Sequence, residues 1–161
     1  MKAARLIAMK KGYHVEKKNT WEELYNQIFL NEIEPKLGRG KPTILYEFPS
    51  AMGALCRPKP SDPRFVERFE FYIEGLELGD CYGELTDWKE QALRFKHELR
   101  ERKRLGKINH PADGDFINAL KVGLPECAGL ALGVDRVAML FTNSKNISES
   151  LLFPAAELWP I

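Results

Sequence analysis

Helical spacing of apolar residues marks the first predicted helix. Thr20 and Glu23 form a capping box, in which each side chain can bind a free backbone amide at the start of a helix. Apolar residues then recur at steps of three and four, until Pro35 and Gly38 interrupt the pattern. The apolar stripe of this helix should pack inward; it consists of Trp21, Leu24, Tyr25, Ile28 and Phe29.

Later segments predict three further helices. A long one is expected from a cap at Thr86 or Asp87 to about Leu105, with one apolar side. Asp115 can cap a shorter helix that ends near residue 123, and residues 137–141 continue a helix after a glycine-containing strand. Helices therefore recur along the second half of the chain.

Alternating apolar and polar residues predict the strands. Thr43–Phe48 indicates one strand, and 128–134 indicates another that contains glycines. From Arg68 onward the apolar residues alternate, and their phase flips at Glu74-Gly75, which a two-residue hairpin turn explains. Of the two hairpin faces this predicts, one carries Phe69, Phe71, Ile73, Leu76 and Leu78, and the other carries Glu70, Tyr72 and Glu77.

These elements predict an α+β fold with an antiparallel β-sheet flanked by helices. The 161 residues fit one domain, 1–161, in which we expect residues 1–19 to be a peripheral basic segment, because they show no sustained period. Composition is ordinary for a globular protein, at 44% apolar and 29% charged residues. A disordered or fibrous chain is therefore excluded.

Charge, membrane segments and cysteines narrow the function classes. A net charge of +1 gives no overall attraction to nucleic acid or to anionic lipid, so any polyanion site must be local. We expect a cytoplasmic protein, because no apolar run reaches the length of a membrane span or a secretory signal. Cys56, Cys81 and Cys127 are too widely spaced for a zinc motif, and we expect three free thiols.

Glu70 and Glu77 form the first candidate site. The hairpin makes them diagonal neighbours on one face. A solvated face tolerates two carboxylates, and that is one interpretation. The alternative is a magnesium site, since this hard cation takes carboxylate oxygens together with water and nucleotide phosphates.

The segment after Glu77 contains the second candidate. Asp80, Tyr82 and Glu84 share parity and can line one pocket, which would suit an ammonium group through ion pairing and cation–π attraction. An acidic turn before a helix is the alternative. In residues 129–136, small residues alternate with large apolar ones and leave room for a flat ring, and Arg136 offers planar donors to a polyphosphate. A buried glycine-containing strand would explain that pattern equally.

The long helix is rich in basic residues, interleaved with Glu90, Glu98 and Glu101. We interpret it as a solvated helix face in which Glu98 can pair with Arg102, and docking of an acidic protein or RNA is the alternative. The basic residues are Arg94, Lys96, Arg100, Arg102, Lys103, Arg104 and Lys107.

Taken together, residues 43–154 resemble the C-terminal half of the class II lysyl-tRNA synthetase catalytic core. Within that family they resemble most the branch that attaches lysine or β-lysine to elongation factor P. Three motifs in order carry the resemblance: RFEFYIEGLELGDCYGELTDWKEQALRF, GKINHPADGDFINALKVGLPECAGLALGVDRVAMLF and LLFP. The resemblance implies a partial class II aminoacyl-tRNA synthetase core.

The resemblance also implies roles for individual residues. Glu70 and Glu77 match the acids that hold ATP and its Mg²⁺, and Gly133 and Arg136 match the residues at adenine and the triphosphate, which makes Arg136 the expected catalytic residue. The implied substrate-binding residues, for lysine or β-lysine, are Asp80, Tyr82, Glu84 and Ala131. Of these, Glu84 matches the acid that binds the lysine ammonium, and Tyr82 the aromatic residue beside it.

Two positions depart from the pattern of the family. Ala131 replaces a glycine that is usual in lysyl-tRNA synthetases, in agreement with the elongation factor P branch. Asp80 replaces an asparagine common to both branches, and its added negative charge should weaken binding of the amino-acid carboxylate.

The resemblance implies an ATP-dependent ligase that forms an aminoacyl-adenylate. Family members carry motifs 1 and 2 ahead of the matching region, and we expect a truncated enzyme that lacks them, so that the motif-bearing half can be present without catalysis. Its partners would then be elongation factor P or a missing N-terminal half. The alternatives are a non-catalytic relic that binds nucleotide, amino acid or a protein, and a lysyl-tRNA synthetase fragment acting on tRNA, which the neutral net charge disfavours.

Overall fold

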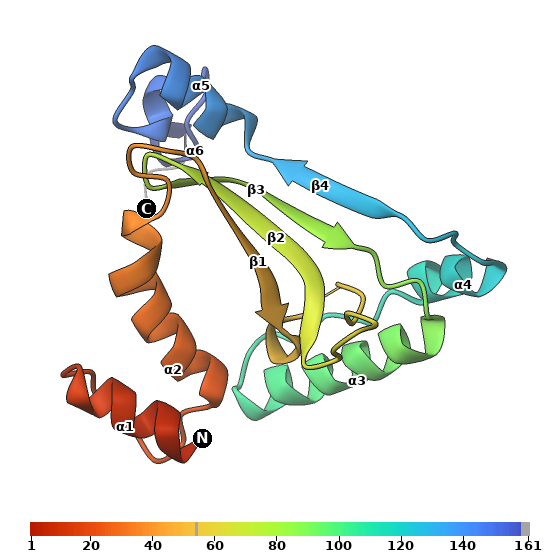
Figure 1. Cartoon of the computed structure of the whole chain (residues 1–161). Coiled ribbons are helices and arrows are strands. Elements are labelled where there is room, and N and C mark those ends of the chain that lie inside the picture. Colours follow the sequence, from red (N-terminus) through yellow and green to blue (C-terminus); the bar gives the residue numbers. More distant parts are fainter. Residues whose placement is uncertain (54, 159–161) are drawn as a thin grey trace. The chain divides into compact units, whose positions relative to one another are not determined.

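A computed structural model describes residues 1–53 and 55–158 (Figure 1). In chain order, its elements are α1 (Lys2–Lys10), α2 (Trp21–Ile28), the π-helical η1 (Phe29–Ile33), the 3₁₀-helical η2 (Glu34–Lys36), β1 (Thr43–Pro49), the 3₁₀-helical η3 (Ser50–Met52), β2 (Phe65–Ile73), β3 (Leu76–Gly83), α3 (Trp88–Arg104), α4 (Gly114–Val122), β4 (Ala128–Leu132), α5 (Val134–Thr142), the 3₁₀-helical η4 (Ile147–Glu149) and α6 (Ala155–Leu158).

The strands form one antiparallel sheet in the order β1-β2-β3-β4. Helices occur before, between and after the strands, so the predicted α+β class with an antiparallel sheet is confirmed. Cys56, Cys81 and Cys127 are free thiols, as predicted. Among the described residues, no helix is long and apolar enough to span a membrane.

The chain divides into two compact units, and each strand contributes residues to both. Unit 1 holds the described residues of Met1–Leu45, Glu70–Asp80 and Ala131–Ile161, and unit 2 holds those of Tyr46–Phe69 and Cys81–Leu130. The expectation that residues 1–161 behave as one domain in solution stays a prediction. Each unit is described separately below.

The capping box at the start of α2, in unit 1, is confirmed. The Glu23 amide donates to Thr20 Oγ1 over 3.2 Å, and the Thr20 amide donates to a Glu23 carboxylate oxygen over 3.0 Å. Leu24 is fully buried, and the Tyr25 ring stacks between Trp21 at 5.2 Å and Phe29 at 5.5 Å. The apolar stripe therefore packs as its spacing predicted.

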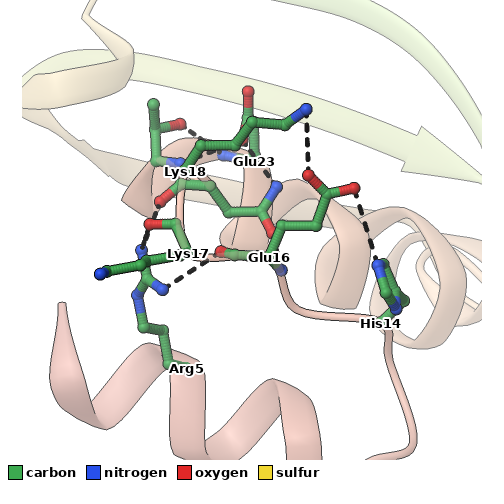
Figure 2. A network of polar contacts seen from close by, with 8 residues as sticks. Arg5, His14, Glu16, Lys17, Lys18 and Glu23 are labelled. Carbon is green, nitrogen blue, oxygen red and sulfur yellow. Dashed lines mark hydrogen bonds and ion pairs between the residues drawn. The ribbon is translucent and has the colours of Figure 1, made fainter.

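The N-terminal segment contains a helix, α1, although residues 1–19 show no sustained apolar period and were expected to be peripheral. Figure 2 shows why the helix α1 is held: the Arg5 guanidinium donates to the backbone carbonyls of Glu16, Lys17 and Asn19, over 3.1, 2.6 and 3.1 Å. Ala8 is fully buried. These contacts join residues more than ten positions apart, so no local sequence pattern could indicate them.

The turn between β2 and β3 has the conformation that the phase flip predicted. Glu74 and Gly75 have φ values of 51° and 80°, as a type I′ hairpin turn requires. Their amides donate to the carbonyls of Gly38 and Leu37, each over 2.9 Å. The segment after η2 is thereby fixed to the hairpin within unit 1.

The two helices of unit 2, α3 and α4, begin at aspartate caps. Asp87 accepts hydrogen bonds from the amides of Lys89 and Glu90, as predicted for α3. The cap of α4 is Asp113, which accepts from the Phe116 amide, so the expectation that Asp115 caps this helix was wrong. Both aspartates lie within three residues of Phe116, so the sequence alone did not distinguish them.

Candidate functional site

The polar face of β2 is buried, contrary to the interpretation of a solvated hairpin face. The exposed fractions of Glu70 and Tyr72 are only 6% and 1%, whereas Phe71 and Ile73 on the other face are half-buried. The Tyr72 hydroxyl donates a hydrogen bond to the Glu70 carboxylate. A carboxylate at such a depth is tolerated only with strong partners, so this pair is a specific feature of unit 1.

Two further carboxylates act on the Tyr72–Glu70 pair through their charges. Burial raises the pKa of the Tyr72 hydroxyl far above its usual range, and the hydrogen bond to Glu70 raises it further. The negative charges of Glu34 and Glu77 act in the same direction. The phenol therefore remains a hydrogen-bond donor at any physiological pH.

Arg136 and Glu77 meet in unit 1. Arg136, in the first turn of α5, donates through Nη1 to the Glu77 carbonyl over 2.7 Å, and the same nitrogen lies 3.8 Å from the Glu77 carboxylate. The Gly133 amide donates to the Leu78 carbonyl over 2.8 Å, which fixes the start of α5 against β3. The guanidinium of Arg136 is half-exposed and can accept an anionic ligand.

Glu34, in η2, is a site residue that the sequence did not reveal. Burial raises the pKa of the Glu34 carboxyl, the charge of Glu77 raises it further, and the charge of Arg136 lowers it. Glu34 therefore lies within electrostatic reach of both residues. Its only sequence signal is its position before Pro35, where a helix was expected to end.

Three carboxylates and one guanidinium of unit 1 are the groups that could bind a divalent cation together with phosphates. Glu34, Glu70 and Glu77 influence one another or Tyr72 through their charges, and Arg136 is the cation that opposes them. A hard cation would relieve this excess negative charge. In residues 1–53 and 55–158, no three side chains of His, Cys, Asp or Glu are arranged to hold an ion by themselves, so phosphates and water would have to complete the ligand sphere.

Replacing Glu34 by glutamine should stabilise the protein at pH 7. Because the pKa of Glu34 is raised in the folded state, its protonated form stabilises the fold at low pH, and this contribution is lost as the pH rises through that raised pKa. We expect Glu34→Gln to raise the free energy of unfolding by under about 1 kcal/mol at pH 7, and by almost nothing near pH 4. Urea unfolding at both pH values measures this, with Glu74→Gln as the control. A gain that is equal at both pH values would contradict the electrostatic cause.

The register of the hairpin changes along β3. A Cβ added to Gly79 would lie 2.5 Å from Cε1 of Phe71, so the two residues face the same side, and in unit 2 the Arg68 guanidinium lies over the Tyr82 ring. The straight register from the turn would put each of these pairs on opposite faces. The contacts indicate that β3 accommodates one extra residue, as in a β-bulge.

This change of register affects Asp80. In unit 1 it places the half-buried Asp80 on the same side of the sheet as Glu70. A Cβ at Gly79 would also approach the Ala131 carbonyl to 2.9 Å, so glycine permits the close passage of β3 and β4. The straight alternation of the sequence placed Glu70 and Asp80 on different faces.

Tyr82 and Glu84 lie in unit 2. The Arg68 guanidinium carbon is 5.5 Å from the centroid of the Tyr82 ring and 4.4 Å from that of Phe48. One face of Tyr82 is therefore already covered by a cation of the chain, which the sequence did not indicate.

Gly129 provides the space for Glu84. A Cβ at Gly129 would lie 2.5 Å from the Glu84 carboxylate, and the Glu84 amide donates to the Cys127 carbonyl over 3.0 Å. The small residue in β4 thus makes room for a carboxylate of the chain.

The structure therefore groups the predicted site residues in two sets. Glu70, Glu77, Asp80, Ala131, Gly133 and Arg136 belong to unit 1, and Tyr82 and Glu84 belong to unit 2. Direct contact is observed for Arg136 with Glu77. That both sets serve one substrate stays a prediction.

Comparison with known sequences decides the family. The family described as "tRNA synthetases class II (D, K and N)" matches residues 11–157, more than the stretch 43–154 on which the resemblance rested. The chain belongs to this family. The resemblance drawn from the motifs is thereby confirmed.

Several relatives of the chain have the name elongation factor P–(R)-beta-lysine ligase. The proteins from Proteus mirabilis, Hamiltonella defensa and Mannheimia succiniciproducens are 44%, 46% and 38% identical to it, over 83%, 79% and 93% of the chain. These matches cover 41%, 39% and 47% of the respective relatives. This class II chain thus spans less than half the length of the ligases that it resembles.

Proposed function

We propose that this chain carries part of an ATP-dependent lysine-activating site, like that of the elongation factor P β-lysine ligases. The observation that carries the proposal is the grouping of Glu70, Glu77 and Arg136 in one compact unit, with an excess of carboxylates. Such a grouping suits a triphosphate with its magnesium ion. The names of the relatives point to the same chemistry.

In the proposed reaction, the carboxylate of lysine or β-lysine attacks the α-phosphorus of ATP. The bond from this phosphorus to the pyrophosphate oxygen breaks, which yields an aminoacyl-adenylate and pyrophosphate. The acyl group then passes to an amine of elongation factor P, with release of AMP. Such a reaction requires positioning and charge neutralisation rather than a protein nucleophile.

Residues of unit 1 would bind and orient the ATP. Arg136 would donate to the triphosphate, and Gly133 would lie at the adenine, where a Cβ would make no contact closer than 3.4 Å. Glu70 and Glu77 would hold Mg²⁺, which when bound neutralises the charge of the triphosphate. Tyr72 keeps Glu70 oriented through its hydrogen bond.

The amino-acid end of the substrate is assigned to four residues. Glu84 would pair with the side-chain ammonium and Tyr82 would flank it, and Gly129 leaves the Glu84 carboxylate its space. Asp80 and Ala131 would lie at the other end of the amino acid. The carboxylate of Asp80 opposes that of the substrate, which favours weak binding of the amino acid alone.

A polypeptide that supplies the rest of the catalytic core is the proposed partner. One observation supports it: α5 exposes an apolar face. On that face Val134 and Phe141, seven residues apart, are 68% and 89% exposed. Apolar residues so exposed and so aligned favour an interface.

Lysine-dependent exchange of pyrophosphate into ATP tests this function. The chain is assayed alone, and then with the part of the Proteus mirabilis relative that it does not match, using lysine and β-lysine in turn. We expect exchange only in the combined sample. Exchange in neither sample, with the partner shown to bind, would overturn the proposed activity.

A non-catalytic role in nucleotide binding is the second candidate. It is favoured by the contacts of Arg136, whose guanidinium already binds the Glu77 carbonyl and lies beside its carboxylate. In that case ATP would bind to the chain, and the combined sample would still show no exchange.

A further inference from the structure

A stripe of basic residues follows one face of α3 in unit 2. Lys89, Lys96, Arg100 and Lys103 are separated by seven, four and three positions, so they share one side of the helix. All four are exposed. No ion pair or hydrogen bond engages the side chains of Lys96, Arg100 and Lys103 within the described part of the chain.

Other basic residues of α3 have partners inside the protein. Arg94 binds Glu90 and the Cys56 carbonyl, over 2.9 Å in each case. Arg104 pairs with Glu101 over 2.8 Å.

Arg102 donates to the Ile108 carbonyl over 2.7 Å, and not to Glu98 as its spacing had suggested. The carboxylates of α3 are thus engaged or placed away from the stripe. Its cations stand three and four positions apart, where like charges destabilise an isolated helix by about 0.2–0.5 kcal/mol per pair. Repulsion within the basic stripe therefore lowers the stability of α3 and contributes nothing to folding.

An apolar groove lies beside the stripe. A cavity of about 320 Å³ separates α3 from α4, with Phe95, Leu99 and Ile117 among its lining residues. Lys96 lines it from α3 and Lys121 from α4. The surface therefore combines cations at the rim with room for an aliphatic side chain.

We propose that this surface, the α3 basic stripe with its groove, docks the acidic face of the acceptor protein. That the partner is an acceptor rests on the proposed function. Carboxylates at helical or strand spacing would match the stripe, and complementary charge of this kind steers association and fixes register.

Protein is favoured over RNA by the aromatic residues of the surface. Single-stranded RNA binds on open aromatic faces. Here Phe95 packs against Phe116 with ring centroids 6.0 Å apart. The Trp88 ring is approached by the ammonium groups of Lys89 at 5.7 Å and Lys121 at 5.2 Å. Each of these three rings thus already contacts an aromatic or cationic group of unit 2.

Fluorescence anisotropy with labelled elongation factor P tests the proposal without ATP. We expect the triple variant Lys96→Glu, Arg100→Glu, Lys103→Glu to bind about tenfold to a hundredfold more weakly at low salt, and the difference to shrink at high salt. The triple glutamine variant at the same positions should be intermediate, and circular dichroism checks that α3 remains folded.

The matched control reverses three exposed lysines of unit 1: Lys2, Lys10 and Lys41. It should change the dissociation constant less than about twofold, because these three lysines are not part of the α3 basic stripe. The proposal is overturned if the triple glutamate variant of the stripe and the unit 1 control weaken binding equally, or if elongation factor P does not bind. It is also overturned if oligouridine RNA binds more tightly than elongation factor P and depends on the same stripe residues. ATP binding tests the proposed function separately and should not change in the stripe variants.

Discussion

Replacing Gly38 by alanine should strongly destabilise unit 1. Gly38 has a φ of 73°, and an added Cβ would lie 2.6 Å from both the carbonyl carbon and oxygen of Tyr72. These are backbone atoms of β2, which cannot move aside as a side chain can. We expect a loss of about 3 kcal/mol or more in the free energy of unfolding, measured by urea denaturation.

Gly40 provides a matched control for this change. Its φ of 71° is nearly the same, but nothing lies within 4 Å of the position of an added Cβ. Gly40→Ala should therefore cost only the strain of a left-handed residue, about 1 kcal/mol. Equal losses for the two variants would show that the close approach of residue 38 to Tyr72 does not exist.

Tyr72→Phe should have the second largest effect on stability. The change removes the hydroxyl that donates to the buried Glu70 carboxylate, and it adds no bulk. A hydrogen bond to a buried charge contributes about 1.5–3 kcal/mol, and we expect a loss of that size in urea unfolding at pH 7.

A double-mutant cycle with Glu70→Gln separates this bond from general packing. The glutamine can still accept from Tyr72 but carries no charge, so Tyr72→Phe in that background should cost about half as much. A cost that is unchanged by Glu70→Gln, or one below about 0.5 kcal/mol in the wild type, would contradict the role given to the pair.

Local signals in the sequence predicted most elements correctly. The capping box at Thr20 and the aspartate at residue 87 mark helix starts by their own hydrogen bonds, and these form as expected. The Glu74-Gly75 turn was readable because only a two-residue connection explains the phase flip. In each case the few residues that carry the signal also make the decisive contacts.

Features that depend on distant contacts were missed. Helix α1 is held through Arg5 by carbonyls of the following loop. On β2 the buried side chains are those of Glu70 and Tyr72, which burial by other parts of the fold decides. On α3 the fully buried residue is Gln91, whereas apolar spacing alone puts Trp88, Ala92, Phe95 and Leu99 on the inward side. Hydrophobic periodicity ranks faces by composition and cannot register such pairings.

The candidate site was predictable in part, for the same reason. Motif residues such as Glu77 and Arg136 were identified from the resemblance, and the structure brings these two together. Glu34 lies outside the motifs, and Arg68 opens the first motif but was given no role there. Only tertiary structure puts Glu34 near Arg136 and Arg68 over Tyr82. The spacing of residues in the sequence does not reveal charges that reach a site from another element of the fold.

Calorimetric titration of the chain with ATP, with and without magnesium, tests the central claim most directly. We expect binding that requires magnesium and is abolished by Glu77→Gln, since Glu77 would hold the ion. Glu74→Gln, a carboxylate change at the turn of the same hairpin, should leave it intact. No binding to the wild type, or binding equally strong in Glu77→Gln, would contradict a magnesium–ATP site in this chain.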